Sequence, residues 1–107
     1  RKVSFFKMIY KTICASTAKN SYHEEIEFIF SKWNLKEVNK FTDLVESELN
    51  RLSINQVMGN FKFENIYSLV ISKQTTIYYR VNMEKCVIEI IVFWNNLKNP
   101  DDLIKLL

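Results

Sequence analysis

The period of the hydrophobic pattern changes once along the chain, near residue 66. Before that point, apolar residues recur every three or four positions over residues 18–33 and again over residues 35–52, which predicts two α-helices. After it, β-branched and aromatic runs alternate with short polar segments, which predicts strands. This order indicates an α+β domain in which a helical pair packs against a sheet.

Three strands are predicted in the second half of the chain, at residues 66–71, 76–81 and 86–94. Their connections are short, so the three strands should form an antiparallel meander. The third is apolar at nearly every position, which is typical of an internal strand covered on both faces. A further strand is predicted at residues 8–15, with an extension back through residues 3–6.

Polar residues mark the beginning of the first helix. Ser16 or Thr17 can supply its N-cap, because a short hydroxyl side chain accepts a hydrogen bond from the first turn. Glu24, Glu25 and Glu27 are expected mostly on the face opposite the apolar stripe. Their position in the first half of the helix suits the helix dipole.

The second helix should follow the first at once, which makes an αα-hairpin. Asn34 and Glu37 fit a capping box at its beginning. Residues 53–64 are expected to be a loop in which Gly59 supplies a positive φ or a turn. At the end of the chain, Asn99 and Pro100 indicate the start of a short helix over residues 101–107.

The predicted fold is therefore β-α-α-β-β-β, an antiparallel sheet packed against an αα-hairpin, with a short C-terminal helix. A length of 107 residues fits a single domain, residues 1–107. A composition that is 48% hydrophobic and 14% aromatic can fill a core and excludes a disordered chain.

The net charge of +3 comes from one short segment. Arg1, Lys2 and Lys7 account for the whole excess of 15 basic over 12 acidic residues, so the remainder is neutral. Two interpretations of residues 1–7 stay open, an upstream extension or a remnant of cloning. A neutral remainder with few arginines does not favour binding driven by nucleic-acid phosphates.

Several chemistries lack the residues that they need. The sequence has no nucleotide-binding glycine motif, no CxxC or HExxH motif and no long apolar span, so we expect no cofactor, metal or membrane segment. Cys14 and Cys86 are interpreted as reduced thiols of a cytoplasmic protein. His23 is interpreted as a partly exposed helix residue.

The candidate contact residues lie on the meander and just after it: Lys73, Tyr79, Arg80, Asn95 and Lys98. Alternation along the second strand predicts that one tyrosine of the Tyr78–Tyr79 pair is buried and that the other flanks Arg80. Arg80 and the flanking tyrosine can then stack on a base or bind a carboxylate of a partner. Alternatively, Arg80 forms a cross-strand pair that fixes the register. Lys73 is either part of this surface or a solvated turn lysine.

Three segments in sequence order resemble the RelE/ParE superfamily of bacterial type II toxin–antitoxin toxins. They are residues 69–73 (LVISK), 77–81 (IYYRV) and 90–100 (IIVFWNNLKNP), and the ParE-like branch has similar VISK…(I/L)YYRV strands and a FWDTRxNP strand exit. The resemblance covers nearly the whole chain and implies the same β-α-α-β-β-β fold. It also implies a cognate antitoxin as partner.

The two branches of that family imply different activities. RelE-like members are ribosome-dependent mRNA endonucleases, and their basic or aromatic positions correspond here to Tyr67, Leu69, Thr76, Leu97 and Leu103, none of which is basic. In-line cleavage of RNA needs a group that stabilises the negative charge of the phosphorane and a general base, so this sequence does not favour that chemistry. The ParE-like branch implies poisoning of DNA gyrase.

Three hypotheses follow from the sequence: a ParE-like gyrase poison, a RelE-like endonuclease, and an inactive homologue that only binds antitoxin. Leu97 stands where the strand exit usually has arginine, and Asn95 replaces the aspartate. Whether the chain is an enzyme stays open at this point.

Overall fold

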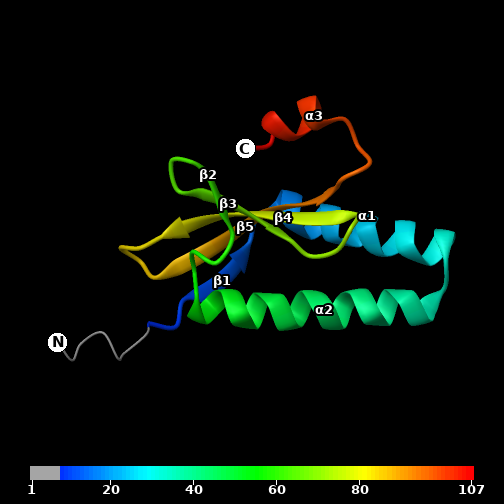
Figure 1. Cartoon of the computed structure of the whole chain (residues 1–107), viewed down its shortest axis with the longest axis horizontal. Helices are drawn as coiled ribbons and strands as arrows, with labels where there is room; N and C mark the ends of the chain where they lie inside the picture. Colours follow the sequence, from blue (N-terminus) through cyan, green and yellow to red (C-terminus); the bar gives the residue numbers. More distant parts are fainter. Residues whose placement is uncertain (1–7) are drawn as a thin grey trace.

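The computed structural model describes residues 8–107, which form one sheet with helices on both faces (Figure 1). In chain order the elements are β1 (Lys11–Cys14), α1 (Ser16–Lys32), α2 (Leu35–Ile54), β2 (Asn60–Phe63), β3 (Ile66–Val70), β4 (Thr75–Asn82), β5 (Val87–Asn95) and α3 (Pro100–Ile104). The predicted extension through residues 3–6, and both interpretations of residues 1–7, lie outside the described residues.

The five strands lie in the order β1-β5-β4-β3-β2. The predicted meander is confirmed, because β3, β4 and β5 are antiparallel neighbours. The predicted antiparallel sheet is extended by one parallel pair that the sequence did not predict, since β1 pairs parallel to β5. A parallel pair requires a long crossover, and the segment from β1 to β5 includes both long helices and the meander.

Strand β2 was not predicted from the sequence, which indicated a loop there. All four residues of β2 are exposed, so the segment lacks the apolar alternation that marks a half-buried strand. It pairs only with β3 and forms one edge of the sheet.

Strand β5 is internal and covered on both faces, as its apolar sequence predicted. A register shift in its pairing with β4 places Tyr78 opposite Val92 and Tyr79 opposite Ile90, so Ile91 is an extra residue. Ile91 and Val92 consequently both join the apolar cluster under α3. A bulge of this kind increases the local twist of the sheet.

The beginnings of the two long helices differ in how they are capped. Asn34 caps α2 as predicted, with its Oδ1 accepting a 3.0 Å hydrogen bond from the Glu37 amide. The Glu37 side chain instead lies 3.4 Å from Lys40 Nζ, so only half of the expected capping box forms. The prediction for α1 is wrong: its N-cap is Ala15, which makes no side-chain hydrogen bond.

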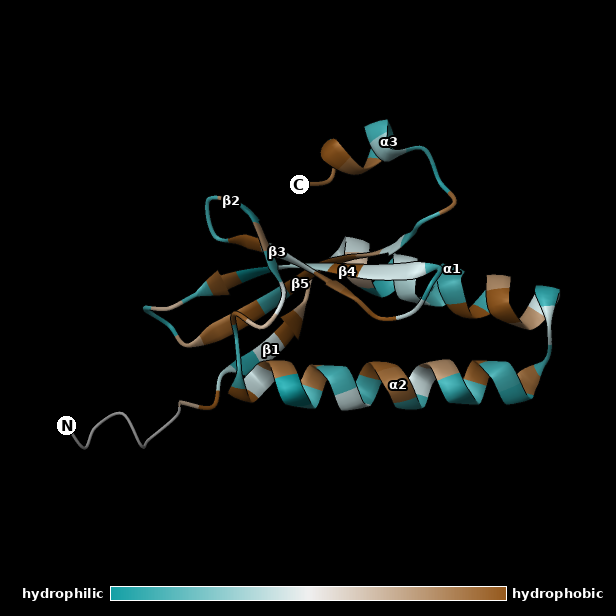
Figure 2. Cartoon of the chain, viewed as in Figure 1, coloured by the Kyte–Doolittle hydropathy of each residue, from teal (hydrophilic) through white to brown (hydrophobic). Residues whose placement is uncertain are grey.

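The inner face of α1 is shifted relative to the predicted stripe. Its buried residues are Ala18, Ser21, Glu25 and Ile29, so Glu25 lies inside, contrary to the expectation for the three glutamates. Phe30, an apolar residue of the helix predicted over residues 18–33, is 57% exposed. Hydrophobic and hydrophilic residues alternate along α2, whose inner face meets the same side of the sheet (Figure 2).

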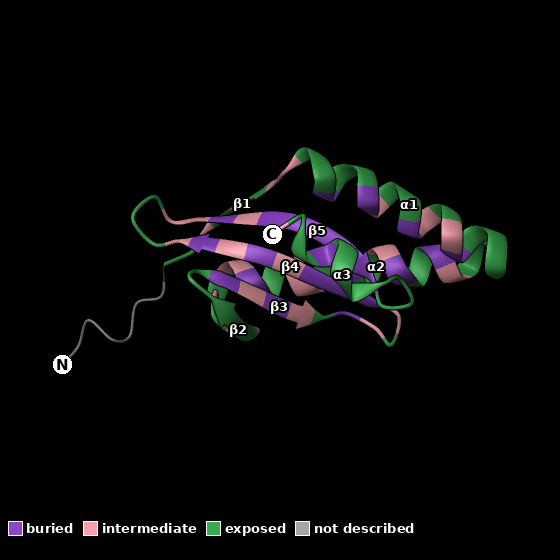
Figure 3. Ribbon diagram, turned by 90° about the horizontal axis from the view of Figure 1, so that it is seen from above, coloured by how far each residue is buried: buried purple, intermediate pink, exposed green. Residues whose placement is uncertain are grey.

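Two apolar clusters lie on opposite faces of the sheet, and β4 and β5 are buried along most of their length (Figure 3). The larger cluster joins the sheet to α1 and α2 and includes Phe41, Leu52, Ile77, Tyr79, Ile88 and Phe93. The smaller one lies under α3 and consists of Ile66, Ile91, Val92, Trp94 and Leu103. The two faces together agree with the predicted α+β class.

Glycine is needed at position 59 because a side chain would have no room there, and not because of its backbone angle. Gly59 has no positive φ, contrary to one of the two expectations for it. A Cβ on Gly59 would lie 2.5 Å from the Ser68 carbonyl oxygen and 2.7 Å from Tyr79 Oη, so a side chain has no room. The left-handed turn positions are Glu64 and Cys86, with φ of 51° and 54°.

Candidate functional site

The candidate contact residues gather mainly at one end of the sheet. We call this region the strand-exit corner and define it as the turn at residues 71–75 together with residues 94–99, where the chain leaves β5. Asn96 joins the two segments: its amide donates to the Gln74 carbonyl at 2.7 Å, and its side-chain amide donates to the Lys73 carbonyl at 3.2 Å. The Thr76 hydroxyl donates to Asn96 Oδ1 at 2.9 Å.

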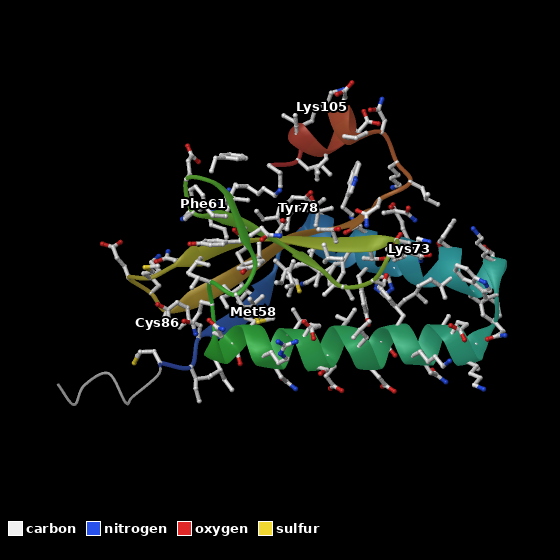
Figure 4. All side chains as sticks on the ribbon, viewed as in Figure 1. Met58, Phe61, Lys73, Tyr78, Cys86 and Lys105 are labelled. Atoms are coloured by element: carbon white, nitrogen blue, oxygen red, sulfur yellow. The ribbon has the colours of Figure 1, made fainter. Side chains whose placement is uncertain are left out.

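Two exposed lysines flank the strand-exit corner. Lys73 lies at the opposite end of the sheet from the turn that holds Cys86 (Figure 4). Lys98 is 55% exposed, and its Nζ lies 3.5 Å from Glu24 Oε1 and 5.8 Å from the centre of a Trp94 ring. Both lysines can reach a partner, because Lys73 is exposed and the surface pair of Lys98 with Glu24 is weak and exchanges readily with other anions.

Asn95 belongs to the fold of the corner rather than to its surface. Its side chain is buried, with 6% exposure. Its Nδ2 donates to Glu25 Oε1 at 2.9 Å, and its Oδ1 accepts from the Leu97 amide at 2.9 Å. The expectation that Asn95 offers its amide to a partner is therefore corrected, because both ends of that amide are already bonded within the protein.

Tyr79 is also inside the protein. Its ring is fully buried and stacks on Tyr67, with 5.5 Å between ring centres. Its hydroxyl donates to the Gln56 carbonyl at 3.0 Å and accepts from the Gly59 amide at 3.1 Å. Burial raises the pKa of Tyr79 to about 12. The prediction that one of the paired tyrosines is buried is confirmed, and the candidate Tyr79 is the buried one.

Arg80 forms the cross-strand pair that the sequence left as one of two alternatives. It lies directly opposite Glu89 on β5, and its Nη1 is 3.0 Å from Glu89 Oε1. Both side chains are about one-third exposed, so the pair lies at the surface of the α3 face. Tyr78 lies on the same face and packs against the small apolar cluster (Figure 4).

The positions that correspond to endonuclease residues do not converge. Tyr67 and Leu69 pack in the large cluster, towards α1 and α2. Thr76 pairs with Trp94 and so faces α3, on the opposite side of the sheet. Leu97 is 71% exposed at the strand-exit corner, whereas Leu103 is buried on the inner side of α3.

Glu25 is a site residue that the sequence did not predict. Within residues 8–107 it is the one buried side chain among the aspartates, glutamates, lysines, arginines and histidine, and it bonds to Thr75 and Asn95 at the corner. The signal was present, because Glu25 lies four residues after Ser21 and four before Ile29, and both of these are buried. The prediction put Glu25 on the exposed face because of its charge, although its spacing from Ser21 and Ile29 indicates the buried face.

A second candidate surface is a groove between α1 and α2, which we call the interhelical groove. Its volume is about 580 Å³. Its apolar floor consists of Cys14, Ala18, Tyr22, Val45, Leu49 and Phe93. Lys19 and His23 lie along its α1 rim, and Asp43 and Glu46 lie along its α2 rim. The groove thus presents an apolar floor between a basic and an acidic edge.

Cys14 and Tyr22, which line the interhelical groove, both have a pKa that favours the neutral side chain. Burial raises the pKa of the Cys14 thiol, and the nearby Lys19 charge opposes this in part. Burial raises the pKa of Tyr22 as well, and the Glu46 carboxylate adds to the effect. A thiol whose pKa is raised is a poor nucleophile, so these shifts suit a binding surface better than covalent catalysis.

Within residues 8–107 no group of three or more His, Cys, Asp or Glu side chains is placed to hold a metal ion. Cys14 and Cys86 are both free thiols. None of the helices that the structure describes is both long and apolar enough to cross a membrane.

No protein-family model matches the sequence, and neither does any curated protein. Solved structures similar in fold include chains of two toxin–antitoxin systems. A chain of the chromosomal ParDE TA system from P. aeruginosa is 12% identical with a TM-score of 0.68, over 82% of this chain and 97% of that one. A chain of the toxin–antitoxin complex RelBE2 from Mycobacterium tuberculosis is 16% identical with a TM-score of 0.53, over 80% and 96%. At these identities the likeness establishes a RelE/ParE-like fold, which confirms the predicted fold.

Proposed function

We propose that the chain is the toxin of a type II toxin–antitoxin module, that it acts as a ParE-like poison of DNA gyrase in the cytoplasm, and that a cognate antitoxin neutralises it. The observation that carries the proposal is the fold, which nearly the whole length of a ParDE chain shares. The sequence segments at residues 69–73, 77–81 and 90–100 point to the same branch.

The interhelical groove supports the antitoxin part of the proposal. Its apolar floor suits an amphipathic helix, which would bury its apolar stripe there. The basic α1 rim and the acidic α2 rim would favour a helix with acidic residues along one border of the stripe and basic residues along the other. The groove therefore supplies both the affinity and the direction of binding.

The strand-exit corner supports gyrase poisoning over RNA cleavage. The positions that correspond to endonuclease residues lie on opposite faces of the sheet or are apolar. Lys73 and Lys98 are exposed at the corner, and the carboxylate beside Lys98, that of Glu24, is paired with the Lys98 ammonium group at 3.5 Å. A binding surface of this kind can hold a partner protein without performing acid–base chemistry.

Two other functions remain candidates. The likeness to a RelBE2 chain favours a RelE-like mRNA endonuclease as the second candidate. Leu97 at the position of the usual arginine favours the third, an inactive homologue that only binds antitoxin. Each of the three functions predicts a different result when the chain is expressed without its antitoxin.

Controlled expression in a bacterial host separates the three functions. A ParE-like toxin arrests growth, and the purified chain with gyrase and supercoiled plasmid yields linear DNA after denaturation of the enzyme. An endonuclease arrests growth but produces codon-linked cuts in primer extension on translated mRNA. Growth that continues, together with a stable complex with the product of the adjacent small gene, would leave only the inactive binding module.

A further inference from the structure

Glu25 is a buried carboxylate without a cation. Its side chain is 3% exposed, whereas Glu24 and Glu27 on the same helix are exposed. The Thr75 hydroxyl donates to its Oε2, and the Asn95 side chain donates to its Oε1 at 2.9 Å. Within residues 8–107 no lysine, arginine or histidine forms an ion pair with Glu25. A buried charge held only by neutral donors is costly, so its location calls for a role.

An ionised carboxylate can only accept hydrogen bonds, and this dictates how its partners point. The Asn95 side chain must turn its NH2 group towards Glu25. Its Oδ1 then faces the other way, where it accepts from the Leu97 amide at 2.9 Å. Glu25 thereby fixes the backbone of the strand exit through the orientation of one amide.

The same carboxylate reaches the turn on the other side of the corner. Thr75 and Asn95 lie directly opposite each other on β4 and β5, so Glu25 bonds to both strands at their last pair. The following residue, Asn96, bonds to the Lys73 carbonyl. The two lysine-bearing segments are thus connected through one network that begins on α1.

We propose that Glu25 is a positioning residue that holds the two segments of the strand-exit corner in one arrangement, by fixing the orientation of the Asn95 amide and of the Thr75 hydroxyl. The positioning stands on hydrogen bonds in the free protein. Its consequence for a partner rests on the proposed function, which makes the corner part of the working surface.

The polarity of the Glu25–Asn95 pair provides the test. Asn95→Asp puts two carboxylates within hydrogen-bond distance, where they repel and one oxygen loses its donor. Glu25→Gln keeps an oxygen that accepts from Asn95, and its NH2 group can donate a hydrogen bond to the Thr75 hydroxyl oxygen. The double variant again pairs one amide with one carboxylate, with the direction of the hydrogen bond reversed. Glu27→Gln removes the same charge from an exposed position of α1 and is the matched control.

Amide hydrogen exchange at Leu97 in the free protein measures the corner. We expect Asn95→Asp to accelerate it by about tenfold, the loss of roughly one hydrogen bond. We expect Glu25→Gln, Glu27→Gln and the double variant to stay within about threefold of the original chain. Fluorescence emission from Trp94, measured in a Trp33→Phe background, should likewise change in Asn95→Asp and stay nearly the same in the other three variants.

Two results would overturn the positioning role. One is Leu97 exchange that stays slow in Asn95→Asp. The other is a folded double variant that exchanges as fast as that single variant. If Asn95→Asp does not fold, Thr75→Val removes the second donor with little change in shape, and unchanged exchange at Leu97 and Asn96 in that variant would overturn the role as well.

Growth arrest on expression tests the functional consequence separately. If the original chain arrests growth, Asn95→Asp should require about tenfold more inducer for the same arrest, and the double variant should recover. If Asn95→Asp arrests growth as the original chain does, although its Leu97 amide exchanges fast, the arrangement of the corner is not needed for the activity. If the original chain does not arrest growth, the proposed function has failed, and the exchange experiment still decides the role of Glu25.

Discussion

The amide of Gly59 donates a 3.1 Å hydrogen bond to the hydroxyl of Tyr79, which donates in turn to the Gln56 carbonyl at 3.0 Å. One phenol in the core therefore holds the segment between α2 and β2 against the middle of the sheet. The absence of a side chain at Gly59 makes that approach possible, since a Cβ would lie 2.5 Å from the Ser68 carbonyl oxygen.

We predict that Gly59→Ala lowers the free energy of unfolding by about 1–3 kcal/mol, because the added methyl group has no space. Urea unfolding followed by circular dichroism measures the loss. Asn60→Ala, at the next and exposed position, is the control and should change stability by no more than about 0.5 kcal/mol. Equal losses in the two variants would contradict the steric argument.

Tyr79 should make stability decline at high pH. Its pKa of about 12 in the folded protein lies above the ordinary value near 10, so the folded state keeps a proton that the unfolded chain releases. Its contribution is complete below pH 10 and is lost as the pH rises towards 12, a total of roughly 2–3 kcal/mol. Urea unfolding at a series of pH values follows this decline.

Tyr79→Phe provides the comparison for that pH series. At pH 8 the variant should be less stable by about 1–3 kcal/mol, because Gly59 and Gln56 lose their partner. Between pH 10 and pH 12 it should decline less steeply than the original chain. Parallel curves across this interval would show that another group causes the decline.

The Arg80–Glu89 pair should stabilise the register of β4 and β5 by less than about 1 kcal/mol, since both side chains are partly exposed. Arg80→Glu places like charges opposite each other and should reduce stability, and adding Glu89→Arg should restore it. Thermal unfolding of the three proteins measures this. If the double variant recovers stability but not growth arrest, Arg80 also contacts a partner. Recovery of both would assign Arg80 to the sheet alone.

Leu97→Arg should increase toxicity if the strand-exit corner is part of the working surface. Leu97 is 71% exposed, so the substitution should change stability by no more than about 0.5 kcal/mol. One new charged hydrogen bond should lower the inducer needed for growth arrest by about tenfold. An unchanged growth phenotype in a folded variant would remove Leu97 from that surface.

Thr42→Arg should weaken neutralisation by the antitoxin, because Thr42 lines the interhelical groove and the new charge would be buried under the bound helix. We expect at least about tenfold lower affinity for the product of the adjacent small gene, measured by calorimetry. Ser47→Arg adds the same charge to an exposed position of α2 that does not line the groove, and it is the control. Equal affinities for the two variants would place the antitoxin elsewhere.

The sequence predicted those elements whose patterns are local. The αα-hairpin followed from helical spacing and from Asn34, and the meander followed from apolar runs with short connections. Strand β2 was missed because an exposed edge strand has no alternation to detect. The parallel pairing of β1 depends on where two helices carry the chain, which no local pattern records.

The candidate site was predictable only in part, because the type of a residue does not specify whether its side chain is exposed. Lys73 and Lys98 are at the surface, as charged residues near turns usually are. Asn95 and Tyr79 are buried with their polar groups bonded inside, and Glu25 is buried although its charge predicted a solvent face. Each of these depends on a donor or acceptor distant in the sequence, such as the Gln56 carbonyl for Tyr79.

The α+β class, the two helices and the three strands of the meander can be predicted from the sequence, because hydrophobic period and capping act over a few residues. The polar side chains that face inward, and the segments that meet at the strand-exit corner, follow only from how distant parts of the chain pack together. The physical reason is that a buried carboxylate or amide is stable only where its hydrogen-bond partners already lie, and for Glu25 those partners are 50 and 70 residues away.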